Sequence, residues 1–185
     1  MTICSFELGG NFATFRKPDA NQVYLTYNNP PYPAILGVLG SIMGWAGYSV
    51  KEKQKVELPE FYRLLTSLCV SIRPIFQKEQ QVFSKQMVTY NNFHGYGNNG
   101  GCMQITEQIL ISPSWRIFLL GENEEYSDLF QNLKNKRTVF TPYLGKNEFR
   151  AEISEFKELA IKEELTEKIS GMSSIKLDSL ALLKD

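Results

Sequence analysis

The pattern of hydrophobic and polar positions predicts alternating strands and helices in the first 76 residues. Residues 3–8 alternate in polarity, which is typical of a half-buried strand, and two glycines end the alternation. Residues 11–25 predict a loop or ribbon, and the charge-free residues 33–48 predict a first, buried helix. A short helical turn at 57–65 leads to a second strand at 68–76, in which Pro74 indicates a sheet edge or a bulge.

The chain changes character between residues 77 and 113. Gln, Asn, Tyr, Lys and Gly dominate this segment, and two β-like runs, 81–90 and 102–112, flank the glycine-rich residues 91–101. Such a pattern is typical of two strands joined by a turn. We therefore expect a long β-hairpin that projects from the fold.

The rest of the chain predicts a buried strand at 114–120, a helix at 124–136 and a last strand at 149–153. Residues 154–170 either extend that strand or form a charged helix. With the hairpin and the short turn set aside, the order is β-α-β-β-α-β, so we expect an α+β, ferredoxin-like fold of the kind that RNA-recognition (RRM) modules use. This domain would span residues 1–153, with the hairpin inserted at about 77–113 and a short acidic extension at 154–185.

The charges are balanced overall but unevenly distributed. Lys and Arg together number 20, as do Asp and Glu, and a net charge of zero argues against a free-standing nucleic-acid binder. Residues 1–150 nevertheless carry 15 basic against 12 acidic side chains, whereas residues 151–185 carry 5 against 8. Any RNA binding should therefore depend on shape and on partner subunits.

Composition suits a folded cytoplasmic protein with free thiols. Hydrophobic residues make up 43% of the chain, and the first twenty residues lack the pattern of a secretory signal. Four glycines interrupt the uncharged residues 33–50, so we expect a buried helix there and no membrane insertion. Cys4, Cys69 and Cys102 are far apart, and the chain has one His, so we expect neither a metal site nor a cofactor.

Candidate binding residues first appear around the approach to the first helix. Thr26, Tyr27 and Asn28 precede three prolines between positions 30 and 33. Unpaired amides at a helix N-terminus can bind a phosphate, although prolines here would equally well aim a core helix. Arg16 and Lys17, in the preceding loop, would grip RNA phosphates or form a solvated pair.

Two further segments carry aromatic, amide and basic side chains. Those in the hairpin segment can stack on unpaired bases or read their edges; they are Lys85, Met87, Tyr90, Asn91, His94 and Tyr96. The loop before the last strand offers Tyr143, Lys146 and Asn147, and its Gly145 would permit a close approach of RNA to the backbone. An ordinary turn explains this loop equally well.

Three segments together resemble the fifth Cas protein family in their order and spacing. They are FELGGNFATFRKP at 6–18, the run at 27–44, and FTPYLGKNEF at 140–149, and the resemblance is closest to type I-B members. That family belongs to the repeat-associated RNA-binding (RAMP) superfamily. The loop at 142–147 is poorer in glycine than is usual there.

The resemblance implies a non-catalytic RNA-binding subunit of a type I CRISPR Cascade interference complex. Such a subunit caps the 5′ handle of the CRISPR RNA (crRNA). Its hairpin, called a thumb, contacts a Cas-seven type backbone subunit. It also docks the large PAM-reading subunit, so target DNA would be met indirectly.

Two other functions remain open at this point. Some type I-C relatives cut precursor RNA with a Tyr, Lys and His group, and Tyr27, Lys85 and His94 are the candidates here for a metal-independent endoribonuclease. The Lys-His adjacency of those relatives is missing. A protein-interaction scaffold, favoured by the neutral charge, is the third interpretation.

Overall fold

The computed structural model describes residues 2–18, 22–48, 57–76, 81–94, 101–121 and 123–159. Four strands form an antiparallel sheet in the order β4-β7-β1-β8. They are β1 (Thr2–Gly9), β4 (Cys69–Pro74), β7 (Ser114–Gly121) and β8 (Glu152–Leu159). The strands predicted at 3–8, 68–76 and 114–120 are present, and Pro74 lies in an edge strand, where a residue without an N–H is tolerated.

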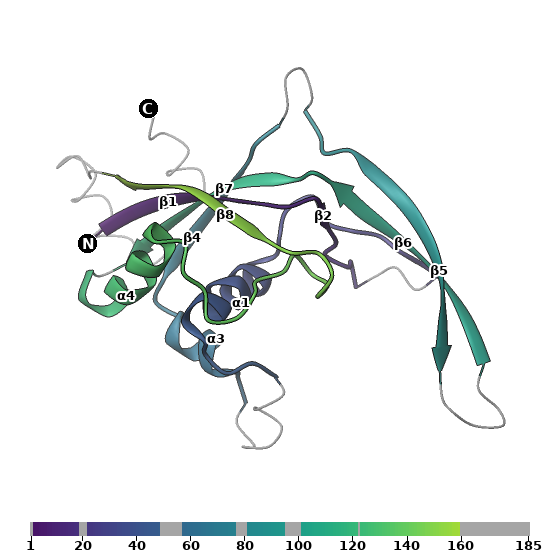
Figure 1. Cartoon of the computed structure of the whole chain (residues 1–185), viewed down its shortest axis with the longest axis horizontal. Coiled ribbons are helices and arrows are strands. Elements are labelled where there is room, and N and C mark those ends of the chain that lie inside the picture. Colours follow the sequence, from purple (N-terminus) through teal and green to yellow (C-terminus); the bar gives the residue numbers. More distant parts are fainter. Residues whose placement is uncertain are drawn as a thin grey trace.

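Three helices lie on one side of this sheet (Figure 1). They are α1 (Tyr32–Met43), α3 (Glu60–Leu64) and α4 (Asn123–Lys134). Helix α1 contacts α3 and α4, and α4 also contacts β1 and β8. The structure confirms the mixed α+β class.

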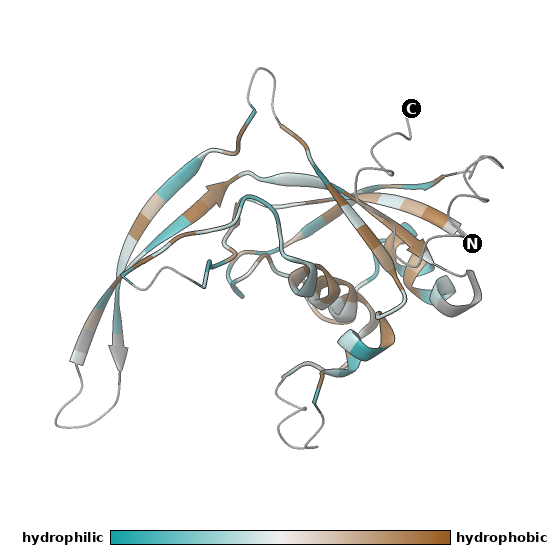
Figure 2. Cartoon of the chain, turned by 180° about the vertical axis from the view of Figure 1, so that it is seen from behind, coloured by the Kyte–Doolittle hydropathy of each residue, from teal (hydrophilic) through white to brown (hydrophobic). Residues whose placement is uncertain are grey.

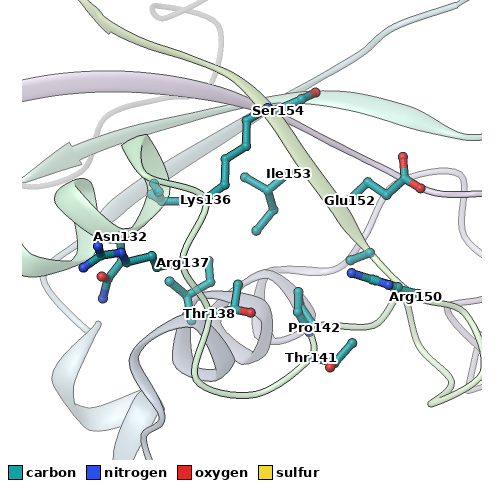
Figure 3. A pocket seen from close by; sticks show the side chains of 13 residues that line it. Asn132, Lys136, Arg137, Thr138, Thr141, Pro142, Arg150, Glu152, Ile153 and Ser154 are labelled. Atoms are coloured by element: carbon teal, nitrogen blue, oxygen red, sulfur yellow. The ribbon is translucent and has the colours of Figure 1, made fainter.

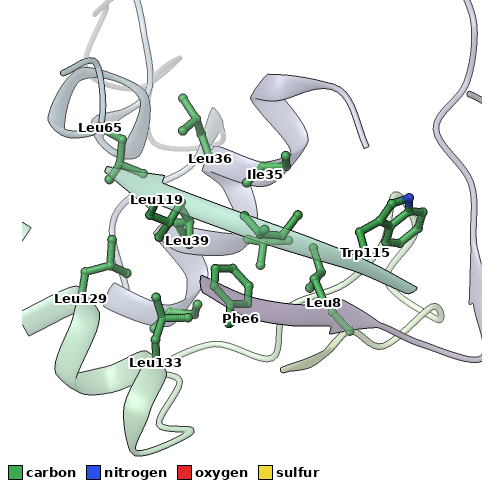
Figure 4. Close-up of a cluster of buried hydrophobic side chains, with 14 of the residues drawn as sticks. Phe6, Leu8, Ile35, Leu36, Leu39, Leu65, Trp115, Leu119, Leu129 and Leu133 are labelled. Carbon is green, nitrogen blue, oxygen red and sulfur yellow. The ribbon is translucent and has the colours of Figure 1, made fainter. Parts of the chain in front are cut away.

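The hydrophobic core lies between the sheet and the helices (Figure 4). Successive strand residues face opposite sides, so Phe6 and Leu8 of β1 point towards the helices together with Leu119 of β7. From α1, Ile35 and Leu39 enter the same core one helical turn apart and are fully buried. Burial of each such side chain stabilises the fold by about 1.5–3 kcal/mol relative to leaving it exposed. A shift in strand register would expose these side chains, so their burial favours the observed register.

Helix α1 is shorter than the sequence predicted. We expected it to reach residue 48, but it ends at Met43 because Gly44 adopts a left-handed conformation (φ 77°) and donates its N–H to the Gly40 carbonyl. Gly40 also lets α3 approach closely, since a Cβ there would lie 2.5 Å from the Cβ of Phe61. No helix of the described ranges combines the length and the apolar character needed to cross a membrane.

A second sheet is built around β6 (Gly101–Ile111). Strand β5 (Lys85–His94) pairs with it antiparallel along its whole length. The other edge of β6 receives β2 (Phe12–Ala13) antiparallel and β3 (Val23–Tyr24) parallel. The predicted pairing of residues 81–90 with 102–112 is therefore present, although β5 begins four residues later than expected. This pair extends away from the helices, and hydrophilic and hydrophobic residues alternate along it (Figures 1 and 2).

The last strand lies further along the chain than predicted. We expected residues 149–153, but β8 begins at Glu152 because residues 142–151 close a loop. In this loop Tyr143 bridges Arg150, and the Ala151 N–H donates to the Pro142 carbonyl (2.9 Å). Of the two alternatives for the residues after 153, extension of the strand is observed as far as Leu159. Residues 160–185 lie outside the described part of the chain.

Trp115 of β7 ties the two sheets together. Its ring makes edge contacts with Phe15 (centroids 6.0 Å apart) and with Phe83 (5.3 Å), which precedes β5. Its indole N–H donates to the Asn28 carbonyl (3.2 Å) and to Oδ1 of Asn29 (3.1 Å). One fully buried side chain thus holds the approach to α1 and the base of the hairpin.

Candidate nucleic-acid interface

Arg16 and Lys17 each stack on a tyrosine of the neighbouring segment. Two backbone hydrogen bonds of 2.8 and 2.9 Å join residues 15–17 to residues 25–27. The Arg16 guanidinium carbon lies 3.5 Å from the Tyr24 ring centroid, and Lys17 Nζ lies 5.5 Å from that of Tyr27. Residues 15–17 and 24–27, named here the cation–aromatic ribbon, therefore hold two positive charges next to aromatic rings.

Thr26 fastens this ribbon to the second sheet. It is 1% exposed, and its hydroxyl accepts a hydrogen bond from the Phe15 N–H (2.8 Å) and donates one to the Tyr27 carbonyl (2.9 Å). Its N–H donates to Oε1 of Gln108 in β6 (3.5 Å). The Thr26 hydroxyl is thus satisfied by the protein, whereas Tyr27 next to it is 39% exposed.

The N-terminus of α1 offers few amides to an anion. Pro31 and Pro33 have no N–H, and the Ala34 and Ile35 N–H groups donate to the Pro31 carbonyl at 2.9 and 3.3 Å. Tyr32 carries the remaining amide of the first turn. The carbonyl of Asn28 accepts the Trp115 bond, which leaves its exposed side chain for a ligand. The prolines therefore aim a core helix.

The hairpin presents its candidates on two faces. Lys85, Met87 and Asn91 share one face of β5 and are exposed, Met87 at 47%. Tyr90 lies on the other face, opposite Ile105. Tyr96 lies outside the described residues, as does the side chain of His94, whose backbone ends β5.

The strand geometry separates two of the three catalytic candidates. Lys85 and His94 are nine residues apart in one strand, roughly 30 Å at about 3.3 Å per residue. A reacting phosphate within reach of one is out of reach of the other.

Lys146 joins the loop at 142–151 to the hairpin. Its Nζ donates to Oε1 of Glu107 (2.5 Å) and to the Tyr90 hydroxyl (3.1 Å), and it lies 4.7 Å from the Tyr90 ring centroid. Burial alone would lower the pKa of Lys146, but its hydrogen bonds to Glu107 and Tyr90 outweigh burial and raise that pKa. Glu107 is 6% exposed, so the ammonium group neutralises a buried carboxylate. We call these three residues the Lys146 clasp.

A pocket of about 320 Å³ lies beside the clasp, between the hairpin and the loop. Its other lining residues are mainly apolar: Phe12, Val88, Ile109, Glu148 and Phe149. Tyr143 and Asn147 are exposed on the same loop, Tyr143 at 47%.

Gly145 makes a close backbone approach within the protein. Its φ is 90°, and a Cβ there would lie 1.6 Å from the Thr14 carbonyl oxygen. The neighbouring Leu144 carbonyl accepts the Thr14 N–H (3.1 Å). The close approach expected of RNA at this glycine is therefore occupied by the chain itself.

The structure brings the candidates together around β6. The ribbon lies at one edge of β6, and β5 pairs with the other edge. The Lys146 clasp contacts β6 between them, at Glu107. Sequence reasoning missed Glu107 and Tyr24. The sequence pattern could have indicated Glu107, because it alternates with Ile105 and Ile109 on the buried face of the strand. A carboxylate on that face requires a hydrogen-bonding or charged partner.

A comparison with solved structures finds similar chains at low sequence identity. A chain of a "CRISPR RNA-guided surveillance complex" superposes with a TM-score of 0.56 at 13% identity, covering 80% of this chain and 59% of that one. A "Cas protein" crystal structure matches with a TM-score of 0.47 at 16% identity, over 80% of this chain and 58% of that one. A chain of the "Type III-B Cmr-beta bound to cognate target RNA" gives 0.49 at 9% identity, over 85% and 60%.

The first of these matches establishes a shared fold. The other two matches have TM-scores below 0.5 and do not establish a shared fold. At 13% sequence identity, the first match shows a similarity of fold alone. The chain spans 59% and 58% of the length of the first two structures. No protein-family model matches the sequence, and no curated protein matches it. The chain has the fold of a chain from a CRISPR RNA-guided surveillance complex.

Proposed function

We propose that this chain is a non-catalytic RNA-binding subunit of a type I CRISPR Cascade complex that caps the 5′ handle of the crRNA. The observation that carries the proposal is the position of the cation–aromatic ribbon on β6, beside the β5–β6 hairpin. The fold shared with a surveillance-complex chain supports it. So does the resemblance to the fifth Cas protein family, closest to type I-B.

The arrangement of the first sheet supports a ferredoxin-like RAMP domain. Its elements follow in the order β1, α1, β4, β7, α4, β8, and the strands lie in the order β4-β7-β1-β8 with every neighbour antiparallel. The β5–β6 hairpin is inserted between β4 and β7. In this proposal it is the thumb that contacts the Cas-seven type backbone subunit, while the large PAM-reading subunit docks on the domain.

RNA recognition in this proposal depends on local geometry. Arg16 and Lys17 hold two phosphates, and Tyr27 offers a ring on which an unpaired base stacks. Met87 and Asn91 on the exposed face of β5 meet bases splayed from the strand. The net charge of zero fits a binder with few ionic contacts.

Salt-dependent binding of a repeat-derived single-stranded RNA tests the proposal. The Arg16→Gln/Lys17→Gln double variant should weaken binding and reduce the slope of log K against log salt by about 1.4, because each lost phosphate contact removes about 0.7. Lys134→Gln is the matched control, since Lys134 at the end of α4 already pairs with Glu158 of β8 (3.1 Å). Equal slopes for the double variant and the wild type would contradict the proposal.

Cleavage assays address the non-catalytic part. Purified protein incubated with repeat RNA should leave the RNA intact, and His94→Ala should change nothing. Cutting that disappears in His94→Ala would establish an endoribonuclease instead.

A further inference from the structure

A second pocket, of about 490 Å³, lies between the C-terminal end of α4 and the start of β8 (Figure 3). Lys136 and Arg137 line it from the α4 side and Arg150 from the β8 side. One carboxylate, that of Glu152, lines it as well. The pocket wall therefore has an excess of positive charge in a chain whose net charge is zero.

These three cationic side chains have no charged or hydrogen-bonding partner within the described residues. All are exposed, and within the described ranges none of their side chains makes a hydrogen bond or an ion pair. Neighbouring cations behave differently: Lys134 pairs with Glu158 at 3.1 Å, and Arg116 pairs with Glu7 at 3.6 Å. The charges of the pocket cations are therefore available to a ligand.

Hydrogen bonds hold the backbone at these three residues. Lys136 adopts a left-handed conformation (φ 52°) at the end of α4, and its N–H donates to the Leu133 carbonyl (3.2 Å). The Arg137 N–H donates to the Asn132 carbonyl (2.9 Å), which completes a Schellman motif. On the opposite wall the bridge to Tyr143 fixes Arg150, which points into the pocket (Figure 3).

We propose that this pocket binds a phosphate group of the RNA backbone, a contact that rests on the function proposed above. Arginine recognises phosphate with a planar fork of donors, and Lys136 adds a point charge. The hydroxyls of Thr138 and Thr141, which also line the pocket, supply further donors.

The surroundings favour RNA over a free anion. Tyr143 is 47% exposed and lies across the bridge from Arg150, so a base can stack beside the bound phosphate. The Glu152 carboxylate disfavours a second anion but accepts a hydrogen bond from a ribose 2′-hydroxyl. The loop that carries Tyr143 and Arg150 also carries Lys146, so this pocket and the hairpin share one support.

Binding of single-stranded RNA by the full chain tests the pocket. Lys136→Gln/Arg150→Gln should reduce the salt slope by about 0.7, because one phosphate contact is lost, whereas Lys134→Gln should leave the slope unchanged. Arg150→Lys with Lys136 intact should keep the slope close to that of the wild type, because the charge remains. Circular dichroism of each variant checks that the fold is intact.

A second arm separates the sources of the phosphate. Amide NMR shifts of residues 136–138, 141 and 150 are followed during titration with the RNA, and separately with AMP and with inorganic phosphate. RNA-induced shifts that vanish in the double variant support the proposal. If AMP or inorganic phosphate shifts these amides and the RNA does not, the RNA assignment is overturned and the pocket is a site for free phosphate groups.

The failure of this inference differs from failure of the proposed function. If the ribbon variant loses RNA affinity while the pocket variant keeps the wild-type slope, and the pocket amides of the wild type do not shift with RNA, the pocket assignment is overturned and the function stands. If the wild type binds no RNA, both are overturned.

Discussion

Glu107 is a buried carboxylate in the middle of β6, and the Lys146 ammonium neutralises it from a loop 39 positions away. Desolvation of a charge is expensive, and the attraction between the two groups repays it only while both are present. At the residue scale, the hairpin is therefore sensitive to the removal of either partner. The Lys146 clasp has a structural role, since the ammonium group of Lys146 and the carboxylate of Glu107 bind each other.

Removing one partner of the clasp should cost more than removing both. Lys146→Met should lower the free energy of unfolding by about 2–3 kcal/mol, because it leaves Glu107 buried and unpaired. The double variant with Glu107→Gln should recover a large part of that loss. Urea unfolding of the single and double variants measures the coupling.

The exposed pair provides the control. Lys134→Met, which breaks the contact with Glu158, should change stability by about 0.5 kcal/mol or less. Strictly additive losses at Lys146 and Glu107 would show that the clasp contributes no coupling energy.

At the scale of elements, the hairpin is long, and its two ends have different surroundings. Near its base, Leu110 is fully buried and pairs with Ala13 of β2. Further out, Asn91 pairs with Gln104, and both are exposed. The outer part of the hairpin therefore contributes little to the core.

Shortening the hairpin should separate binding from folding. Replacing residues 92–103 by Asn-Gly joins the cross-strand partners Asn91 and Gln104 through a two-residue turn that keeps the register. Thermal unfolding should change little, because the buried base is untouched, while affinity for the repeat RNA should fall. Unchanged affinity would show that the outer hairpin takes no part in RNA binding.

The periodicity of the sequence predicted most elements because periodicity is a local property. The boundaries were harder, since non-local contacts decide them. Glycines occur at 37, 40, 44 and 47, yet only the folded chain shows that Gly44 adopts the left-handed conformation that ends α1. Likewise β8 starts late because Pro142 and Ala151 close a loop, a contact that no local pattern encodes.

The residues of the candidate site likewise fall into those that the sequence indicated and those that only the structure shows. Composition indicated Arg16, Lys17 and Tyr27, which the structure places together in the ribbon. It gave no sign that Thr26 is buried, and none that Arg150 lines a basic pocket. Both depend on residues distant in sequence.

At the scale of the whole molecule, the balance of ionised groups sets how stability changes with pH. Burial, with a smaller contribution from Glu158, raises the pKa of the Cys4 thiol from 9.0 to about 12. The folded chain therefore holds this proton after the unfolded chain has lost it. The raised pKa of Lys146 acts in the same direction at still higher pH, where the clasp loses its charge.

Stability should therefore decline in alkaline solution. Between pH 8 and pH 10 the Cys4 thiol alone should lower the free energy of unfolding by about 1.4 kcal/mol, at a limiting slope near 1.4 kcal/mol per pH unit. Cys4→Ala should be less stable at neutral pH but show a flatter decline. Urea unfolding at several pH values checks this, and an unchanged decline in Cys4→Ala would contradict it.

The surroundings of Trp115 have a practical consequence. The chain has two tryptophans, and replacing Trp45 by Phe leaves an indole whose N–H is bound at Asn28 and Asn29 and whose ring touches Phe83. Fluorescence emission from that single indole reports the polarity at the junction of the helix approach and the hairpin base. The protein thus carries an intrinsic optical reporter at the point where its two sheets meet, and ligand titrations can be followed without attaching a dye.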